Sequence, residues 1–128
     1  MGPDLLKCWR VEAKISVVDD EDFLVEIIRE KLELEGFQTE GAGNGVEALE
    51  RLSTFHADLM ISGIRMPVME GVPLLRRCQD DYPDLPVILM TAGSSLTEQE
   101  AIKIGAAGFI SKPFSWDDLL KLIKSVMT

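Results

Sequence analysis

Short apolar segments and amphipathic segments alternate along the chain. Five short runs of largely apolar residues predict β-strands at 14–19, 37–41, 58–61, 86–91 and 107–111. After each run, apolar residues recur every three or four positions, as at Leu24, Ile27, Ile28 and Leu32. This spacing predicts five helices, at 24–32, 46–52, 74–82, 96–104 and 116–127, of which the fourth has the weakest pattern. The chain therefore repeats strand and helix five times.

Residues that begin and end helices lie at the boundaries of these segments. Asn44 and Ser115 precede two of the helices and can cap them. Gly36 and Gly105 follow two others, and Pro83 ends a third. The boundaries therefore agree with the periodicity.

Five alternating strands and helices are typical of an α/β fold, a parallel sheet covered by helices on both faces. Because crossovers are right-handed, few topologies remain. We expect a flavodoxin-like (βα)5 three-layer sandwich with strand order 2-1-3-4-5. In such a fold the functional site lies at the carboxyl ends of the strands, beside the first strand.

Composition limits the partners that the chain can bind. Its 128 residues fit one domain, and 22 acidic against 13 basic side chains give a formal net charge of −9. So acidic a chain is a poor candidate for direct nucleic-acid binding or for an anionic membrane surface. No apolar run approaches the roughly 20 residues that cross a bilayer, and two cysteines form no disulfide framework. We expect a cytoplasmic protein.

Polar residues follow three of the predicted strands. Asp19 and Asp20 end the first, where paired carboxylates suit a hard divalent cation such as Mg²⁺, although aspartates there also suit helix capping. Thr91 ends the fourth strand and could bind an anion or stabilise a turn. Lys112 follows the fifth and could offset the acidic pair or be a solvated charge. Each signal is weak alone, but their joint placement at three strand ends is more specific.

Four segments resemble the receiver domain of two-component response regulators, the CheY-like family. The matching segments, in order and spacing, are Val17–Glu21, Asp58–Gly71, Met90–Ala92 and Ser111–Phe114. The resemblance covers about residues 14–127, and we assign 14–128 to the receiver domain and 1–13 to an N-terminal extension: a tag, a linker remnant or a docked strap.

The resemblance implies a role for each matching residue, and a regulatory module rather than an enzyme. Asp19, Asp20 and the backbone carbonyl of Arg65 would hold Mg²⁺, with Asp20 the more direct ligand. The residues that would contact the phosphoryl group are Thr91, Ala92 and Lys112. The remaining expectations are that Thr91 and Phe109 switch conformation on activation and that the bond preceding Pro113 is cis.

The resemblance also implies partners. A histidine kinase or phosphotransfer protein would supply the phosphoryl group. The surface formed by 96–104, 107–111 and 116–127 would contact an output domain or partner protein.

The chain departs from the family at the phosphoacceptor. Where the family has an aspartate at the end of the third strand, this chain has Gly63. Glycine has no nucleophile and no carboxylate for a metal, so we expect no phosphorylation of this chain and weak Mg²⁺ binding. Ser62 cannot substitute, because side chains alternate in direction along a strand.

Two explanations of Gly63 stay open: an aspartate was replaced, or a natural receiver no longer takes phosphate. Two functional readings follow. The first is a phosphorelay receiver silenced at one position, and the alternative is a pseudo-receiver that acts by protein interaction alone. A flavodoxin-like enzyme or nucleotide binder is a third class, but the chain has no G-x-G-x-x-G after its first strand.

Overall fold

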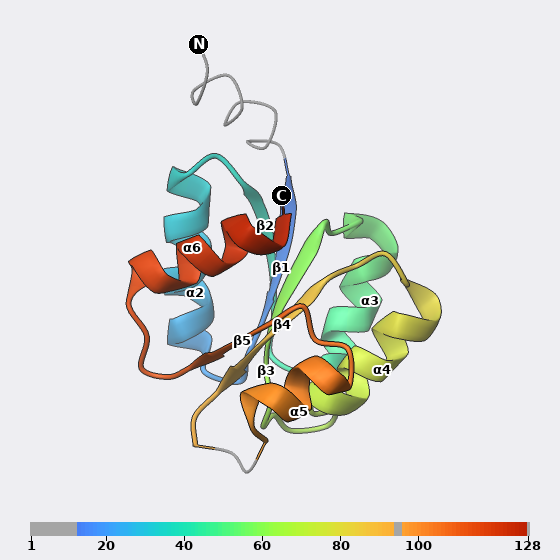
Figure 1. The fold of residues 1–128 in the computed structure, drawn as a ribbon. Coiled ribbons are helices and arrows are strands. Elements are labelled where there is room, and N and C mark those ends of the chain that lie inside the picture. Colours follow the sequence, from blue (N-terminus) through green and yellow to red (C-terminus); the bar gives the residue numbers. More distant parts are fainter. Residues whose placement is uncertain (1–12, 94–95, 128) are drawn as a thin grey trace.

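The computed structural model describes residues 13–93 and 96–127; residues 1–12, and with them most of the predicted extension, lie outside it. Strands and helices alternate in the described part (Figure 1). The strands are β1 (Lys14–Val18), β2 (Gln38–Ala42), β3 (Leu59–Gly63), β4 (Val87–Thr91) and β5 (Gly108–Ser111). The helices are α2 (Asp22–Leu34), α3 (Gly45–Phe55), α4 (Gly71–Asp81), α5 (Glu98–Lys103) and α6 (Trp116–Met127).

The five strands form one parallel sheet in the order β2-β1-β3-β4-β5. The predicted α/β class and strand order are confirmed. The sheet register pairs Val18 with Ser62 and Gly63 with Met90. The carboxyl ends of β1, β3 and β4 therefore lie side by side at the same end of the sheet.

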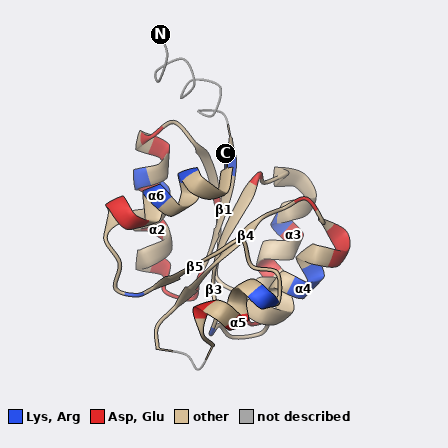
Figure 2. Cartoon of the chain, viewed as in Figure 1, with Lys and Arg blue, Asp and Glu red and all other residues tan. Residues whose placement is uncertain are grey.

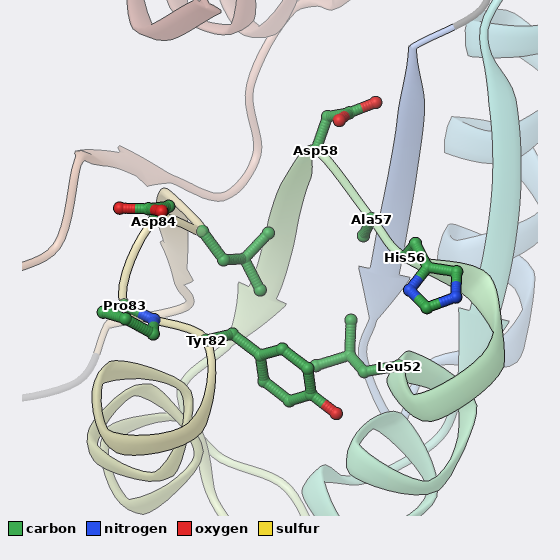
Figure 3. A pocket seen from close by; sticks show the side chains of 8 residues that line it. Leu52, His56, Ala57, Asp58, Tyr82, Pro83 and Asp84 are labelled. Atoms are coloured by element: carbon green, nitrogen blue, oxygen red, sulfur yellow. The ribbon is translucent and has the colours of Figure 1, made fainter.

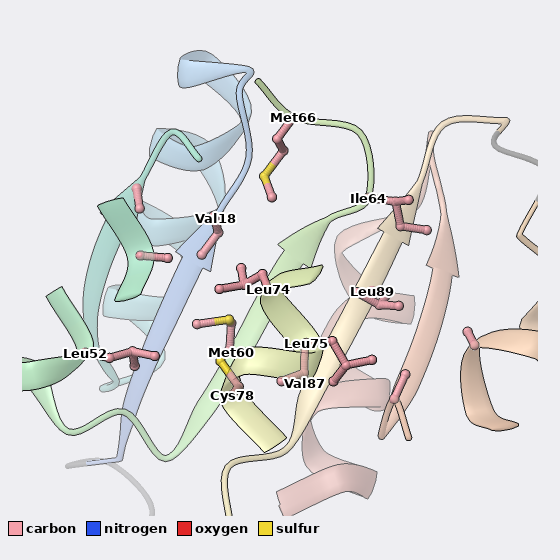
Figure 4. Packing of buried hydrophobic residues seen from close by; sticks show 14 residues of the cluster. Val18, Leu52, Met60, Ile64, Met66, Leu74, Leu75, Cys78, Val87 and Leu89 are labelled. Atoms are coloured by element: carbon pink, nitrogen blue, oxygen red, sulfur yellow. The ribbon is translucent and has the colours of Figure 1, made fainter. Parts of the chain in front are cut away.

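Helices cover both faces of the sheet, with α2 and α6 on one side and α3, α4 and α5 on the other (Figure 1). Alternation along the strands divides the core accordingly. Met60 and Leu89 pack with α3, α4 and α5 (Figure 4). Ile61 and Ile88 pack with α2 and α6 on the opposite face. The central strands are therefore apolar on both sides, as buried parallel strands are.

The predicted caps form. Asn44 Oδ1 accepts a hydrogen bond of 2.9 Å from the Glu47 N–H, and Ser115 Oγ accepts one of 3.1 Å from the Asp118 N–H. The weakest predicted helix, α5, is short and begins with a reciprocal capping box between Thr97 and Glu100. The Thr97-x-x-Glu100 spacing carries this signal in the sequence, although periodicity alone does not reveal it.

The loop between β3 and α4 is packed tightly against the sheet. The Gly71 N–H donates to the Ile64 carbonyl oxygen at 2.8 Å. A Cβ on Gly71 would collide with the backbone carbonyl of Gly63, so only glycine fits there. Within the described residues, no helix has the length and apolar character needed to cross a membrane.

Candidate functional site

The site lies at the carboxyl ends of β1, β3, β4 and β5. Asp19 directly follows β1, Gly63 ends β3, Thr91 ends β4 and Lys112 directly follows β5. The Lys112 N–H donates to the Thr91 carbonyl oxygen at 2.7 Å, which continues the β4–β5 pairing by one residue. Parallel strand order therefore gathers residues that are far apart in the sequence.

Asp19 and Lys112 form a direct ion pair. Lys112 Nζ lies 2.8 Å from Asp19 Oδ2 and also 2.8 Å from Glu21 Oε1. The second oxygen of Asp19, Oδ1, accepts the Glu21 backbone N–H at 2.9 Å. Because Asp19 is only 1% exposed, its charge depends on these partners rather than on water.

Gly63 lies directly beneath the Asp19 carboxylate. A Cβ built on Gly63 would lie 2.5 Å from Asp19 Oδ2 and 3.2 Å from Asp19 Cγ. The backbone of Gly63 lies outside the left-handed region, so its conformation does not itself require glycine. The Asp19 carboxylate therefore occupies the space in which a side chain at position 63 would begin.

Ser62 does not replace the missing nucleophile. Its side chain is fully buried, and its Oγ donates a 2.8 Å hydrogen bond to the Gly63 carbonyl oxygen. The neighbouring residues Ile61 and Gly63 share the opposite side of the strand. The hydroxyl is therefore held away from the site by both strand geometry and its own hydrogen bond.

The surroundings of Lys112 act on its pKa in opposite directions. Burial lowers the pKa, whereas the hydrogen bonds and negative charges of Asp19 and Glu21 raise it. The net result is a pKa above the ordinary lysine value of 10.5. Lys112 is therefore a cation at neutral pH and neutralises part of the acidic cluster.

The residues predicted to hold Mg²⁺ offer an incomplete set of donors. Both oxygens of Asp19 already accept hydrogen bonds, whereas Asp20 is exposed. Gly63 contributes no oxygen, and among the described residues no group of three or more metal-binding side chains gathers at any point. Asp20, the carbonyl of Arg65 and an Asp19 oxygen shared with Lys112 could still hold a hydrated cation, since Mg²⁺ often binds one or two carboxylates and keeps several waters.

The remaining residues that were predicted to belong to the site lie on β4 and β5 or directly after them. Thr91 is buried, and Ala92 follows it as an exposed residue. The bond between Lys112 and Pro113 is cis. Phe109 lies on β5, is partly buried and packs against the core beneath α3, α4 and α5.

Glu21 is the site residue that the sequence interpretation missed. It stands in the motif that carries the family resemblance, yet its contact with Lys112 joins residues 91 positions apart. An acid beside the strand end and a lysine after β5 were both visible in the sequence. Nothing local indicated which of the neighbouring acids the lysine would contact.

Comparison with known proteins agrees with the fold. Residues 15–124 match the sequence model of the response regulator receiver domain. The regulatory protein AtoC of Escherichia coli is 36% identical over 115 residues, which cover 89% of this chain and 25% of AtoC. The chain spans between a quarter and about half of the length of such curated relatives.

Solved structures show the same architecture. A CheY-like receiver domain from Methanospirillum hungatei superposes with a TM-score of 0.85 at 30% identity, covering 91% of this chain and 94% of that one. The CheX-CheY-BeF3-Mg²⁺ complex from Borrelia burgdorferi gives 0.83 at 26% identity, covering 91% and 90%. Since the family match extends over most of the chain, the protein belongs to the response regulator receiver domain family.

Proposed function

We propose that this receiver domain takes no phosphoryl group and regulates its partners through protein contacts alone. The observation that carries the proposal is the position of the Asp19 carboxylate, which fills the space above Gly63 and pairs with Lys112. Formation of an aspartyl phosphate needs a carboxylate nucleophile at the end of β3. Gly63 has none, and Ser62 is buried and hydrogen-bonded, so neither residue at the end of β3 can take this role.

The other residues that match the receiver family at this site are all present in the chain. Thr91 and Ala92 at the end of β4 and Lys112 after β5 would contact a phosphoryl group in this proposal. Asp19 and Asp20, which follow β1, would hold a metal. Restoring a carboxylate at position 63 would therefore restore phosphoryl acceptance. A form with aspartate at position 63 would then receive its phosphoryl group from a histidine kinase or phosphotransfer protein.

The binding surface in this proposal is formed by α5, β5 and α6. Phe109 lies within it, and Ile102 on α5 is 49% exposed, which provides apolar area to a partner. Lys112 connects this surface to the site, since it directly follows β5. With Lys112 held by Asp19 and Glu21, the surface would keep one conformation without phosphate.

Mg²⁺ binds weakly in this proposal. The cation must compete with the Lys112 ammonium for Asp19, and the third carboxylate of the family is absent. When bound, the ion would supply positive charge beside the strand ends. Asp20 and the Arg65 carbonyl would then be its main protein ligands.

Beryllofluoride, which mimics a phosphoryl group on an aspartate, tests the proposal. Amide chemical shifts are recorded by NMR for this chain and for Gly63→Asp, with Mg²⁺ and with or without beryllofluoride. We expect shifts of Thr91, Phe109 and Lys112 only in Gly63→Asp, with Gly63→Asn as the matched variant that has a similar side chain and no acceptor carboxylate. The same shifts in the unaltered chain would show that an acceptor other than residue 63 is present and would refute the proposal.

A further inference from the structure

Helix α5 is the shortest helix of the domain, and little of it is attached to the core. Among its six residues only Ala101 is buried, whereas Ile102 is 49% exposed. An isolated helix of this length is unstable in water, so contacts with the rest of the domain must hold it in place. The contacts at its two ends are therefore important for its position.

The amino end of α5 is capped by its own residues. The Thr97 hydroxyl accepts the Glu100 N–H at 3.1 Å, and the Glu100 carboxylate accepts the Thr97 N–H at 2.9 Å. Figure 2 shows acidic residues at the start of α5 and a basic residue, Lys103, at its end, an arrangement that the helix dipole favours. These interactions stabilise the helix, but they do not join it to another element.

The carboxyl end of α5 turns sharply towards β5. The Gly105 N–H donates to the Ile102 carbonyl oxygen at 3.0 Å, and Gly105 has a φ of 108°. The Ala106 N–H donates to the Ala101 carbonyl oxygen, also at 3.0 Å. The two bonds form a Schellman motif, a common left-handed ending of a helix. This motif fixes the shape of the turn, but it too is local.

Gln79 joins this turn to α4, which lies beside α5 (Figure 1). Its Nε2 donates a 2.8 Å hydrogen bond to the Ile104 carbonyl oxygen, 25 positions away in the sequence. The same amide group lies over Gly105, where a Cβ would collide with the Gln79 amide nitrogen. The carbonyl that ends α5 therefore receives a donor from the neighbouring helix.

Helix α4 is a firm support for Gln79. Leu74 and Cys78 are buried on its core side. Tyr82 directly follows the helix, and its ring lies beside Leu52 of α3 at the wall of a pocket (Figure 3). Gln79 therefore extends from a well-anchored helix to a lightly anchored one.

We propose that Gln79 is a latch that holds α5 in its place in the α5–β5–α6 surface and that opens when α5 moves. The inference rests on the proposed function, in which this surface contacts a partner. Gln79 is a positioning residue, because it acts on that surface through α5. One hydrogen bond of this kind contributes modestly to stability, so contacts between a partner and α5 are sufficient to replace it. The latch would allow α5 to move while the sheet stays folded.

Amide hydrogen exchange, followed by NMR on the full chain, tests the inference. Gln79→Ala removes the donor, and Gln79→Glu keeps the length of the side chain without the donor. The amides of Gly105 and Ala106 are the probes, because their N–H groups are released when the carboxyl end of α5 opens. We expect both to exchange about two- to tenfold faster in each variant, the range that loss of one hydrogen bond allows.

Asn44→Ala is the matched control, because it removes one hydrogen bond, to the Glu47 N–H, from a different helix. It destabilises the whole domain but leaves the local opening of α5 unchanged, so the Gly105 and Ala106 amides should keep their exchange rates. Unchanged rates in the two Gln79 variants, or an equal increase in Asn44→Ala, would overturn the inference. The measurement uses neither phosphodonor nor partner, so its outcome is separate from that of the beryllofluoride experiment.

Discussion

The carboxylate of Asp19 lies where a side chain at position 63 would begin, and this contact connects the sequence change to the properties of the site. An aspartate at position 63 would have to displace Asp19 Oδ2 from its 2.8 Å contact with Lys112, or share that lysine with it. Two carboxylates held this close repel each other unless a cation neutralises them. The energetic consequences can be measured one residue at a time.

Gly63→Asp should lower the free energy of unfolding in the absence of metal. Like-charge repulsion destabilises the folded variant. Replacing glycine acts in the opposite direction, by roughly 0.5–1 kcal/mol, because the unfolded chain then has less conformational freedom to lose. We expect repulsion to dominate at low ionic strength. Denaturant unfolding in chelator measures the difference, and Gly63→Asn separates the charge from the added atoms. An equal or higher stability of Gly63→Asp would mean that repulsion between the carboxylates does not dominate.

Lys112→Met should lower the free energy of unfolding by about 2 kcal/mol at neutral pH, because the buried Asp19 carboxylate loses its cationic partner. The pKa of Lys112 is raised in the folded state, so its contribution is complete below the unfolded pKa, near 10.5. The contribution is lost as the pH rises through the higher folded pKa.

The difference between the two proteins should therefore be constant from about pH 7 to 10 and shrink above pH 10.5. Unfolding measured across this range gives the profile. Lys103→Met, which removes an exposed lysine at the end of α5, controls for the general loss of a positive charge. A difference that is the same at pH 8 and pH 11 would mean that the ion pair does not stabilise the fold.

At the scale of elements, the loop between β3 and α4 shows how the chain holds Gly63 in place. Gly71 begins α4 so close to Gly63 that a side chain would meet its carbonyl. Val68, in the same loop, is 80% exposed and has a φ of 67°. A β-branched residue is strained in this region of backbone space.

Val68→Gly should raise the free energy of unfolding by about 1 kcal/mol. A residue with a Cβ in the left-handed region destabilises the folded state by roughly 1–2 kcal/mol. Glycine removes this strain, but its greater freedom in the unfolded chain offsets part of the stability gained. Because Val68 is exposed, little buried area is lost. Thermal and denaturant unfolding test this, with Val68→Ala as the variant that keeps the Cβ. A lower stability of Val68→Gly than of Val68→Ala would refute the strain.

Sequence patterns predicted the five strands and five helices because apolar periodicity is a local property of the chain. The boundaries were less accurate where residues have weak strand preference. The third strand was predicted to end at Ile61 but continues through Ser62 and Gly63, since its neighbours β1 and β4 supply the hydrogen bonds. The long-range pairing of Lys112 with Glu21 had no local signal, because three-dimensional proximity alone creates it.

At the scale of the whole molecule, the domain has two chemically different ends. The carboxyl ends of the strands carry the receiver site, in which Lys112 neutralises part of the acidic cluster. The amino ends carry exposed acids instead, among them Asp58 and Asp84. In our proposal the first end determines the response of the domain to metal and phosphodonors.

Mg²⁺ should bind this chain about tenfold more weakly than it binds Gly63→Asp, a difference of ~1.4 kcal/mol. The missing carboxylate and the competing Lys112 ammonium both act in this direction. Isothermal titration of the two proteins measures the affinities, with Gly63→Asn as the uncharged comparison. Equal affinities would mean that position 63 does not contribute to the metal site.

Intact mass spectrometry after incubation with acetyl phosphate and Mg²⁺ shows whether Gly63 alone prevents phosphorylation of this domain. This chain, Gly63→Asp and Gly63→Asn are treated side by side. We expect a phosphoryl mass increase in Gly63→Asp alone, because that variant alone has an acceptor carboxylate at the end of β3. A phosphoryl adduct on the unaltered chain, or none on Gly63→Asp, would contradict the claim that Gly63 by itself silences an otherwise intact receiver site.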